Sequence, residues 1–84
     1  MSILTVGERK ALRTYAENVN WFRANYGRIA ARHSNRYIAV NDEAVVDSDA
    51  DPKRLIERLR KRYGQRMSTF AIEFVSTDDT ELIM

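Results

Sequence analysis

A short hairpin in the middle of the chain constrains the fold more than any other feature. Within residues 36–47, two runs of β-branched and aromatic residues, Tyr37–Val40 and Ala44–Val46, flank a turn centred on Asn41 and Asp42. Asn and Asp tolerate a positive φ and hydrogen-bond to their own backbone, so this pattern is typical of a β-hairpin. The chain before it has a helical pattern, and one helix and one strand follow it. The hairpin therefore predicts a small antiparallel sheet combined with helices.

Composition limits the class of protein. The chain has 84 residues, of which 44% are hydrophobic and 31% charged, as in an ordinary folded, soluble domain. It has no cysteine, which excludes disulfides and thiolate metal sites and suits a reducing compartment. No apolar run approaches the ~18 residues of a membrane span, and no signal-peptide core is present. We therefore expect one cytoplasmic domain over residues 1–84, without a membrane segment.

The first third of the chain carries an unbroken apolar repeat with spacings of three and four. Its members are Leu12, Tyr15, Val19, Phe22, Tyr26, Ile29 and His33. The repeat predicts one long helix over residues 8–33, about 37 Å in length at 1.5 Å per residue. Gly27 lies inside this pattern and costs about 1 kcal/mol relative to alanine, so a kink or break there is the competing interpretation.

The length of this helix predicts self-association. Hairpin strands of about five residues span only ~17 Å, so one end of the helix must extend beyond the sheet. The apolar side chains on that end need another surface, and a second copy of the chain is the simplest source of one. We expect a homodimer that uses the residues Leu12, Tyr15, Val19 and Phe22.

Trp21 lies about a third of a turn away from the apolar repeat, on the side of Asn25 and Arg28. Packing against the hairpin or the other helix is the simpler interpretation. The alternative is that Trp21 and Arg28 anchor a partner, since Trp and Arg are enriched at interface hot spots. His33 is the only histidine, so it cannot build a zinc site by itself, and we expect it to have a structural role.

The acidic segment after the hairpin has the spacing Asp47-x-Asp49-x-Asp51, as at the start of a calcium loop. An EF-hand requires Gly at the sixth position and Glu at the twelfth, where this chain has Pro52 and Arg58. The pattern therefore excludes that site. Asp51 followed by Pro52 is instead typical of a helix start.

A second helix is predicted over residues 52–63, with Gly64 as its C-cap. Its apolar stripe consists of Leu55, Ile56, Leu59 and Tyr63. The opposite side carries Arg54, Arg58 and Lys61, which are candidate contacts for a phosphate backbone. A solvated face that pairs with the neighbouring acidic segments explains these charges equally well.

The last predicted element is a strand over residues 69–75, followed by a tail over residues 76–84. The tail ends in Leu82, Ile83 and Met84, which the sequence allows as an extra strand, a partner-binding hook or a frayed end. The fold is predicted as α+β in the order α–β–β–α–β. The last strand would lie beside the first, giving a three-stranded sheet of order 2-1-3 with both helices on one face.

Several short motifs resemble a small uncharacterised prokaryotic domain family. They are Trp21-Phe22, Tyr26, the run Arg36-Tyr37-Ile38-Ala39-Val40, Val45-Val46, Leu55-Ile56 with Leu59, and Ile72-Glu73-Phe74-Val75. The chain departs from the family where Gly-Lys is usual (here Asn35-Arg36) and where the hairpin turn has a glycine (here Asp42-Glu43). Members of the family are often encoded beside retropepsin-like aspartyl proteases. The resemblance therefore implies an accessory partner protein, and it implies no site residues.

The residues themselves predict no enzyme, cofactor or metal site. There is no cysteine, no Gly-rich phosphate loop, and a single histidine for any acid–base role. Charge is segregated: residues 37–52 carry five acidic and no basic groups, and residues 53–66 carry seven basic groups against Glu57. Acidic segments beside each basic one would repel a polyanion. The sequence therefore favours a non-catalytic protein-interaction module over the alternative, a small nucleic-acid-binding protein.

Overall fold

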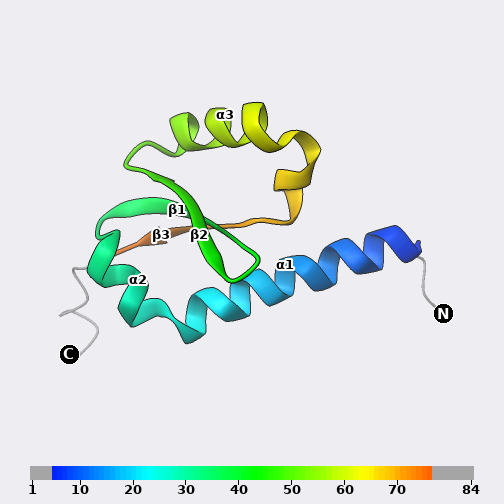
Figure 1. The fold of residues 1–84 in the computed structure, drawn as a ribbon, viewed down its shortest axis with the longest axis horizontal. Coiled ribbons are helices and arrows are strands. Elements are labelled where there is room, and N and C mark those ends of the chain that lie inside the picture. Colours follow the sequence, from blue (N-terminus) through cyan, green and yellow to red (C-terminus); the bar gives the residue numbers. More distant parts are fainter. Residues whose placement is uncertain (1–4, 77–84) are drawn as a thin grey trace.

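The computed structural model of the chain describes residues 5–76. In that range a three-stranded sheet lies between helices (Figure 1). The elements in order are α1 (Val6–Ala24), α2 (Tyr26–Arg32), β1 (Arg36–Asn41), β2 (Ala44–Asp49), α3 (Pro52–Tyr63), the 3₁₀ helix η1 (Gly64–Thr69) and β3 (Ala71–Val75). Residues 77–84 of the predicted tail, which include Leu82, Ile83 and Met84, lie outside the described residues.

The sheet confirms the predicted class and strand order. It is antiparallel with the order β2-β1-β3, so β1 is the central strand. The apolar residues of β1, Ile38, Ala39 and Val40, are fully buried. β3 begins at Ala71, two residues later than predicted, because the 3₁₀ helix continues to Thr69.

The hairpin turn lies one residue later than predicted. Asp42 and Glu43 are its central residues, with φ values of 53° and 60°, and Asn41 remains in β1, paired with Ala44. Positive φ at both central residues is the geometry of a type I′ turn, which matches the twist of the flanking strands. The partners of Ala39 and Val40 are Asp47 and Val45, so the residue between those two forms a β-bulge in β2.

The prediction that both helices cover one face of the sheet is wrong. α1 and α2 pack on one face and α3 on the other (Figure 1). Successive strand residues point to opposite faces, and β1 is apolar at consecutive positions, so both of its faces need a cover. One cluster, here called the α1 core, contains Phe22, Ile29, Ile38, Val40, Ala71 and Val75. The other, the α3 core, contains Ala39, Leu55, Leu59 and Phe70.

The prediction of one continuous helix over residues 8–33 is also wrong, because the helix is broken at Asn25. This residue has φ −115° and ψ 17°, and its side-chain amide donates to the carbonyl of Trp21 at 2.9 Å. A side chain that bonds to the backbone in this way competes with the helical pattern. Gly27 lies two residues later inside α2, where an added Cβ would meet no atom within 4 Å. The break therefore occurs at the asparagine and not at the glycine.

α3 has the predicted bounds. The carboxylate of Asp51 accepts a hydrogen bond from the backbone N–H of Lys53 at 2.9 Å, and Pro52 is the first helical residue. Gly64 ends the helix with φ 60°, a conformation that L side chains rarely adopt. Leu55 and Leu59 are fully buried on the sheet, so the predicted apolar stripe faces the α3 core.

Candidate interaction surfaces

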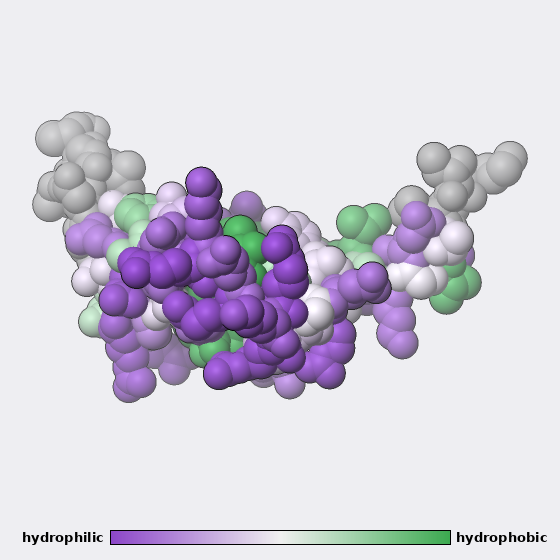
Figure 2. Space-filling view, turned by 90° about the horizontal axis from the view of Figure 1, so that it is seen from above, coloured by the Kyte–Doolittle hydropathy of each residue, from purple (hydrophilic) through white to green (hydrophobic). Residues whose placement is uncertain are grey.

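The N-terminal half of α1 projects beyond the sheet (Figure 1). Leu12 is 56% exposed and Tyr15 44% exposed, although both belong to the apolar repeat. Hydrophobic residues appear among polar ones on this projecting arm in the space-filling view (Figure 2). The other two predicted self-association residues lie in the C-terminal half of α1. Phe22 is buried in the α1 core, and Val19 is half-buried against it. Leu12 and Tyr15 are therefore the members of the predicted set that face solvent.

The start of this projecting helix is stabilised by a capping box. The Thr5 hydroxyl accepts from the backbone N–H of Glu8 at 3.0 Å, and the Glu8 carboxylate accepts from the backbone N–H of Thr5 at 2.8 Å. The backbone bond from Thr5, followed by its hydroxyl, lowers the pKa of Glu8 below its usual value. The helix therefore begins at a defined residue, and residues 5–10 around this start are all exposed.

Asn18 is a buried polar residue that the sequence analysis missed. Its amide donates to Asn41 Oδ1 at 3.1 Å and to the carbonyl of Thr69 at 2.8 Å. Its Oδ1 accepts from the backbone N–H of Asp42 at 3.2 Å. One side chain therefore holds α1 to the hairpin turn and to the end of η1. A polar residue four positions before Phe22, on the side of the helix that faces the core, was the available signal.

A pocket of about 480 Å³ lies between the α1–α2 junction and β2. Its lining includes Trp21, Ile29 and Val45, with Arg28 and Arg32 also contributing. The indole of Trp21 is half-buried and packs against the α1 core, as the simpler interpretation predicted. Trp21 and Arg28, the predicted anchor pair, are thus brought to one pocket.

His33, a half-buried residue that follows α2, also lines this pocket. Its backbone N–H donates to the carbonyl of Ile29 at 2.9 Å and closes the last turn of the helix. The imidazole is thereby placed at the C-terminal end of α2.

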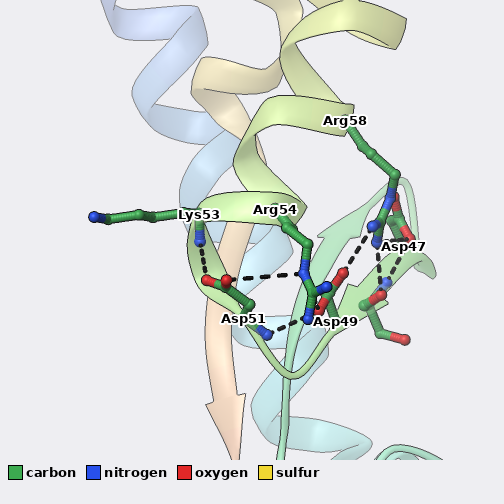
Figure 3. Close-up of polar contacts among 7 residues, drawn as sticks. Asp47, Asp49, Asp51, Lys53, Arg54 and Arg58 are labelled. Atoms are coloured by element: carbon green, nitrogen blue, oxygen red, sulfur yellow. Dashed lines mark hydrogen bonds and ion pairs between the residues drawn. The ribbon is translucent and has the colours of Figure 1, made fainter.

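The acidic segment and the basic helix α3 pair with each other (Figure 3). The Arg58 guanidinium donates to Asp47 at 3.0 and 3.1 Å, to Asp49 at 2.7 Å and to the carbonyl of Ser48 at 2.9 Å. Arg54 lies 3.7 Å from Asp49 and 3.8 Å from a carboxylate oxygen of Asp51. The two arginines hold the start of α3 against the end of β2.

These contacts shift the titration of the carboxylates. The Arg58 side chain is the largest cause of the lowered pKa of Asp47. The pKa of Asp49 is lowered first by the backbone N–H of Asp51 and then by Arg58. The pKa of Arg58 is raised in turn, chiefly by Asp47. The cluster is therefore a charge-compensated surface network.

This network bears on the predicted phosphate contacts Arg54, Arg58 and Lys61. Arg58 and Arg54 are directed toward aspartates of the same chain, whereas Lys61 is exposed and has no ion pair among residues 5–76. The outer side of α3 is strongly hydrophilic (Figure 2). Of the three residues, only Lys61 is therefore available to contact a phosphate without first breaking an ion pair within the described chain.

Within residues 5–76, no group of three or more His, Asp or Glu side chains is placed to hold a metal ion. No helix in the same range is long and apolar enough to cross a membrane.

Comparison with known proteins identifies a family. Residues 28–78 match the family described as "Family of unknown function (DUF5678)". The chain belongs to this family. The match begins inside α2 and continues past the end of β3, so it includes both strands of the hairpin and α3. It confirms the resemblance to a small uncharacterised domain family. No curated protein and no solved structure matched the chain significantly.

Proposed function

We propose that this chain is a non-catalytic protein-interaction module that self-associates through the exposed side of the N-terminal half of α1. The observation that carries the proposal is the exposure of Leu12 and Tyr15 on a helix that extends beyond its own sheet. Exposed apolar side chains on a rigid, capped helix are typical of an interface. A second copy of the chain offers the same surface, as a two-fold dimer requires.

The apolar side of α1 is compatible with an antiparallel pair. At about 100° per residue, Leu12, Tyr15, Ala16 and Val19 fall within a sector of about 100°. In a pair centred between Tyr15 and Ala16, Leu12 of one protomer lies opposite the exposed part of Val19 of its partner, the rest of which packs on the α1 core. Each apolar residue then meets another apolar residue.

The charges at the two ends of this sector favour the same arrangement. Glu8 precedes the apolar residues and Arg23 follows them, on the same side of the helix. The antiparallel pair brings Glu8 of one protomer to Arg23 of its partner, whereas a parallel pair brings like charges together. This complementarity supports a second copy of the chain as the occupant.

Sedimentation equilibrium of matched variants tests the proposal. The parent should have a mass above 9.8 kDa at micromolar concentration. Leu12→Gln/Tyr15→Gln removes apolar surface without adding charge and should give a monomer, with association weakened at least tenfold. Lys10→Gln/Glu17→Gln makes two glutamine substitutions on the far side of the same helix, with no change in net charge, and should associate like the parent. A monomeric parent, or equal loss in both variants, contradicts self-association through this surface.

We further propose that the protein is prokaryotic and serves as an accessory to a partner, as the family resemblance implies, and that it is cytoplasmic, as its composition led us to expect. Mass spectrometry of proteins that co-purify with the chain from its own cells at low salt tests this role. A retropepsin-like protease among them would support the role that the resemblance implies. Recovery of the chain alone would remove the accessory role and leave a self-associating domain.

Nucleic-acid binding through α3 is the alternative, and its support is weaker. Arg58 would have to break its hydrogen bonds to three residues of β2 to contact a phosphate. Binding of this kind should weaken steeply with salt, with a log–log slope near −0.9 per contact for duplex DNA. Undetectable binding of DNA and RNA at about 50 mM salt would exclude it.

A further inference from the structure

The pocket beside β2 combines an apolar floor with a basic rim. Trp21, Ile29 and Val45 supply aromatic and aliphatic surface, and Arg28, Arg32 and His33 line the same space. None of the described residues that line it is acidic. Arg28 and Arg32 lie four residues apart, on one side of α2, and both are exposed.

The guanidinium of Arg28 is held in place by the residue that breaks the helix. Asn25 Nδ2 donates to the carbonyl of Trp21, and Asn25 Oδ1 accepts from Arg28. The guanidinium of Arg28 is thereby linked through one amide side chain to the backbone carbonyl of Trp21, whose indole lines the same pocket. Arg28 forms no ion pair with any of residues 5–76, so its remaining N–H groups are available to a ligand.

The carboxylates of β2 do not neutralise this rim. Asp47 and Asp49 pair with Ala39 and Tyr37 of β1, which contribute to the α3 side of the sheet. Both carboxylates are bound there by Arg58. Val45 instead contacts the α1 core. The positive charge of the pocket therefore lies on the opposite side of the sheet from the carboxylates of Asp47 and Asp49.

We propose that this pocket binds a short acidic peptide segment of a partner protein. An apolar side chain of the peptide packs on Trp21 and Val45, and an adjacent carboxylate accepts hydrogen bonds from Arg28 or Arg32. β2 is an edge strand, so no strand of the described chain covers its outer side, where the peptide lies.

A peptide fits this pocket better than a nucleic acid does. The exposed carboxylates of Asp42 and Glu43 occupy the turn that leads into β2, two and three residues before Val45. A phosphate backbone that continued past the pocket would meet this negative charge. A peptide of four or five residues with one or two carboxylates carries less negative charge than a phosphate backbone and need not extend along the turn.

The fluorescence of Trp21, the single tryptophan, provides a direct test. The probe is the capped pentapeptide acetyl-Leu-Asp-Val-Glu-Leu-amide, titrated into the full chain at low salt. We expect saturable binding with a Kd on the order of 100 µM, and at least tenfold weaker binding of the Asn/Gln form of the peptide. Arg28→Gln should weaken binding of the acidic peptide about tenfold. Arg60→Gln, an equal charge change on the exposed side of α3, should leave it unchanged, with urea unfolding confirming that both variants fold.

Three results would overturn the proposal: no saturation by about 5 mM peptide, equal binding of the acidic and neutral peptides, or an equal effect of the two arginine variants. Tighter binding of inorganic phosphate or of a single-stranded oligonucleotide at the same site would overturn it in favour of a phosphate ligand. The test is independent of self-association, because Leu12→Gln/Tyr15→Gln should bind the peptide like the parent.

Discussion

Asn18 connects three segments that are far apart in the sequence. Its three hydrogen bonds use both N–H groups and one lone pair of the amide oxygen, and the residue is only 3% exposed. A buried amide with every group satisfied fixes both the rotation and the position of the helix that carries it. The side chain therefore determines how the projecting half of α1 leaves the sheet.

Replacing Asn18 by alanine should lower the free energy of unfolding by about 2–3 kcal/mol. The substitution removes three hydrogen bonds and leaves the carbonyl of Thr69 and the N–H of Asp42 without this partner. Urea denaturation followed by circular dichroism measures the change. The control is Asn20→Ala, an exposed position on the same helix, which should change stability by no more than about 0.5 kcal/mol. Equal effects of the two variants would show that Asn18 does not hold the helix.

The hydrogen bonds of Asn18 could not be predicted from its neighbours in the sequence. They reach residues 23 to 51 positions away, and two of the partner groups belong to the backbone of a turn and a 3₁₀ helix. Periodicity identifies which side of a helix faces a core, but it does not identify what lies across from that side. Trp21 and Arg28 were predicted as a pair because both lie on α1–α2 at helical spacing. Val45 lines the other side of their pocket, and the sequence analysis did not predict that it would lie near them.

At the scale of elements, local signals predicted more than long-range patterns did. α3 has the predicted ends because its caps are local signals. Asp51 and Pro52 determine where the helix begins and Gly64 where it ends, each through the adjacent turn of backbone. The break in the long helix was predicted at Gly27 as an alternative, but it depends on a side-chain bond of Asn25 that competes with the helix. The choice of sheet face required knowing that β1 is covered on both sides. Its unbroken apolar run was the signal for this, but the prediction placed both helices on one face.

The junction of β2 and α3 should make stability depend on pH in the acid range. Because the pKa values of Asp47 and Asp49 are lowered below 3.8, the folded protein binds fewer protons than the unfolded chain in the window just below that value. The stabilisation is complete above pH 4–5 and is lost as pH falls through the folded pKa values.

Arg58→Gln should reduce this dependence. The free energy of unfolding should fall less steeply below about pH 4 than in the parent, because the aspartates then titrate closer to their usual value. The two proteins should differ most near neutral pH and converge near pH 2. Urea denaturation across pH 2–7 measures the slopes, with Arg60→Gln as the charge-matched control. A slope in Arg58→Gln equal to that of the parent would exclude the network as its source.

At the scale of the whole molecule, the family match and the folded unit have different boundaries. The match begins at residue 28, so α1 lies outside it. The structure nevertheless places Phe22 of α1 in the same core as Ile38, Val40 and Val75. Without α1, one face of the sheet would keep only the cover of the seven-residue helix α2. The C-terminal half of α1 therefore belongs to the fold, whereas its N-terminal half belongs to the proposed interface.

Two truncations separate these roles. A chain that starts at Arg13 retains Asn18 and Phe22 and should fold, losing about 1 kcal/mol with the cap of α1, and it should be monomeric because Leu12 is absent. A chain that starts at Tyr26 loses Phe22, whose removal alone costs about 3–5 kcal/mol, against a total stability of about 4–13 kcal/mol for 84 residues. It loses the bonds of Asn18 as well, so it should show no cooperative thermal transition by circular dichroism. If the chain from Tyr26 unfolded cooperatively at the temperature of the longer one, α1 would be an appendage, and its exposed residues would not be evidence for an interface built on a fixed helix.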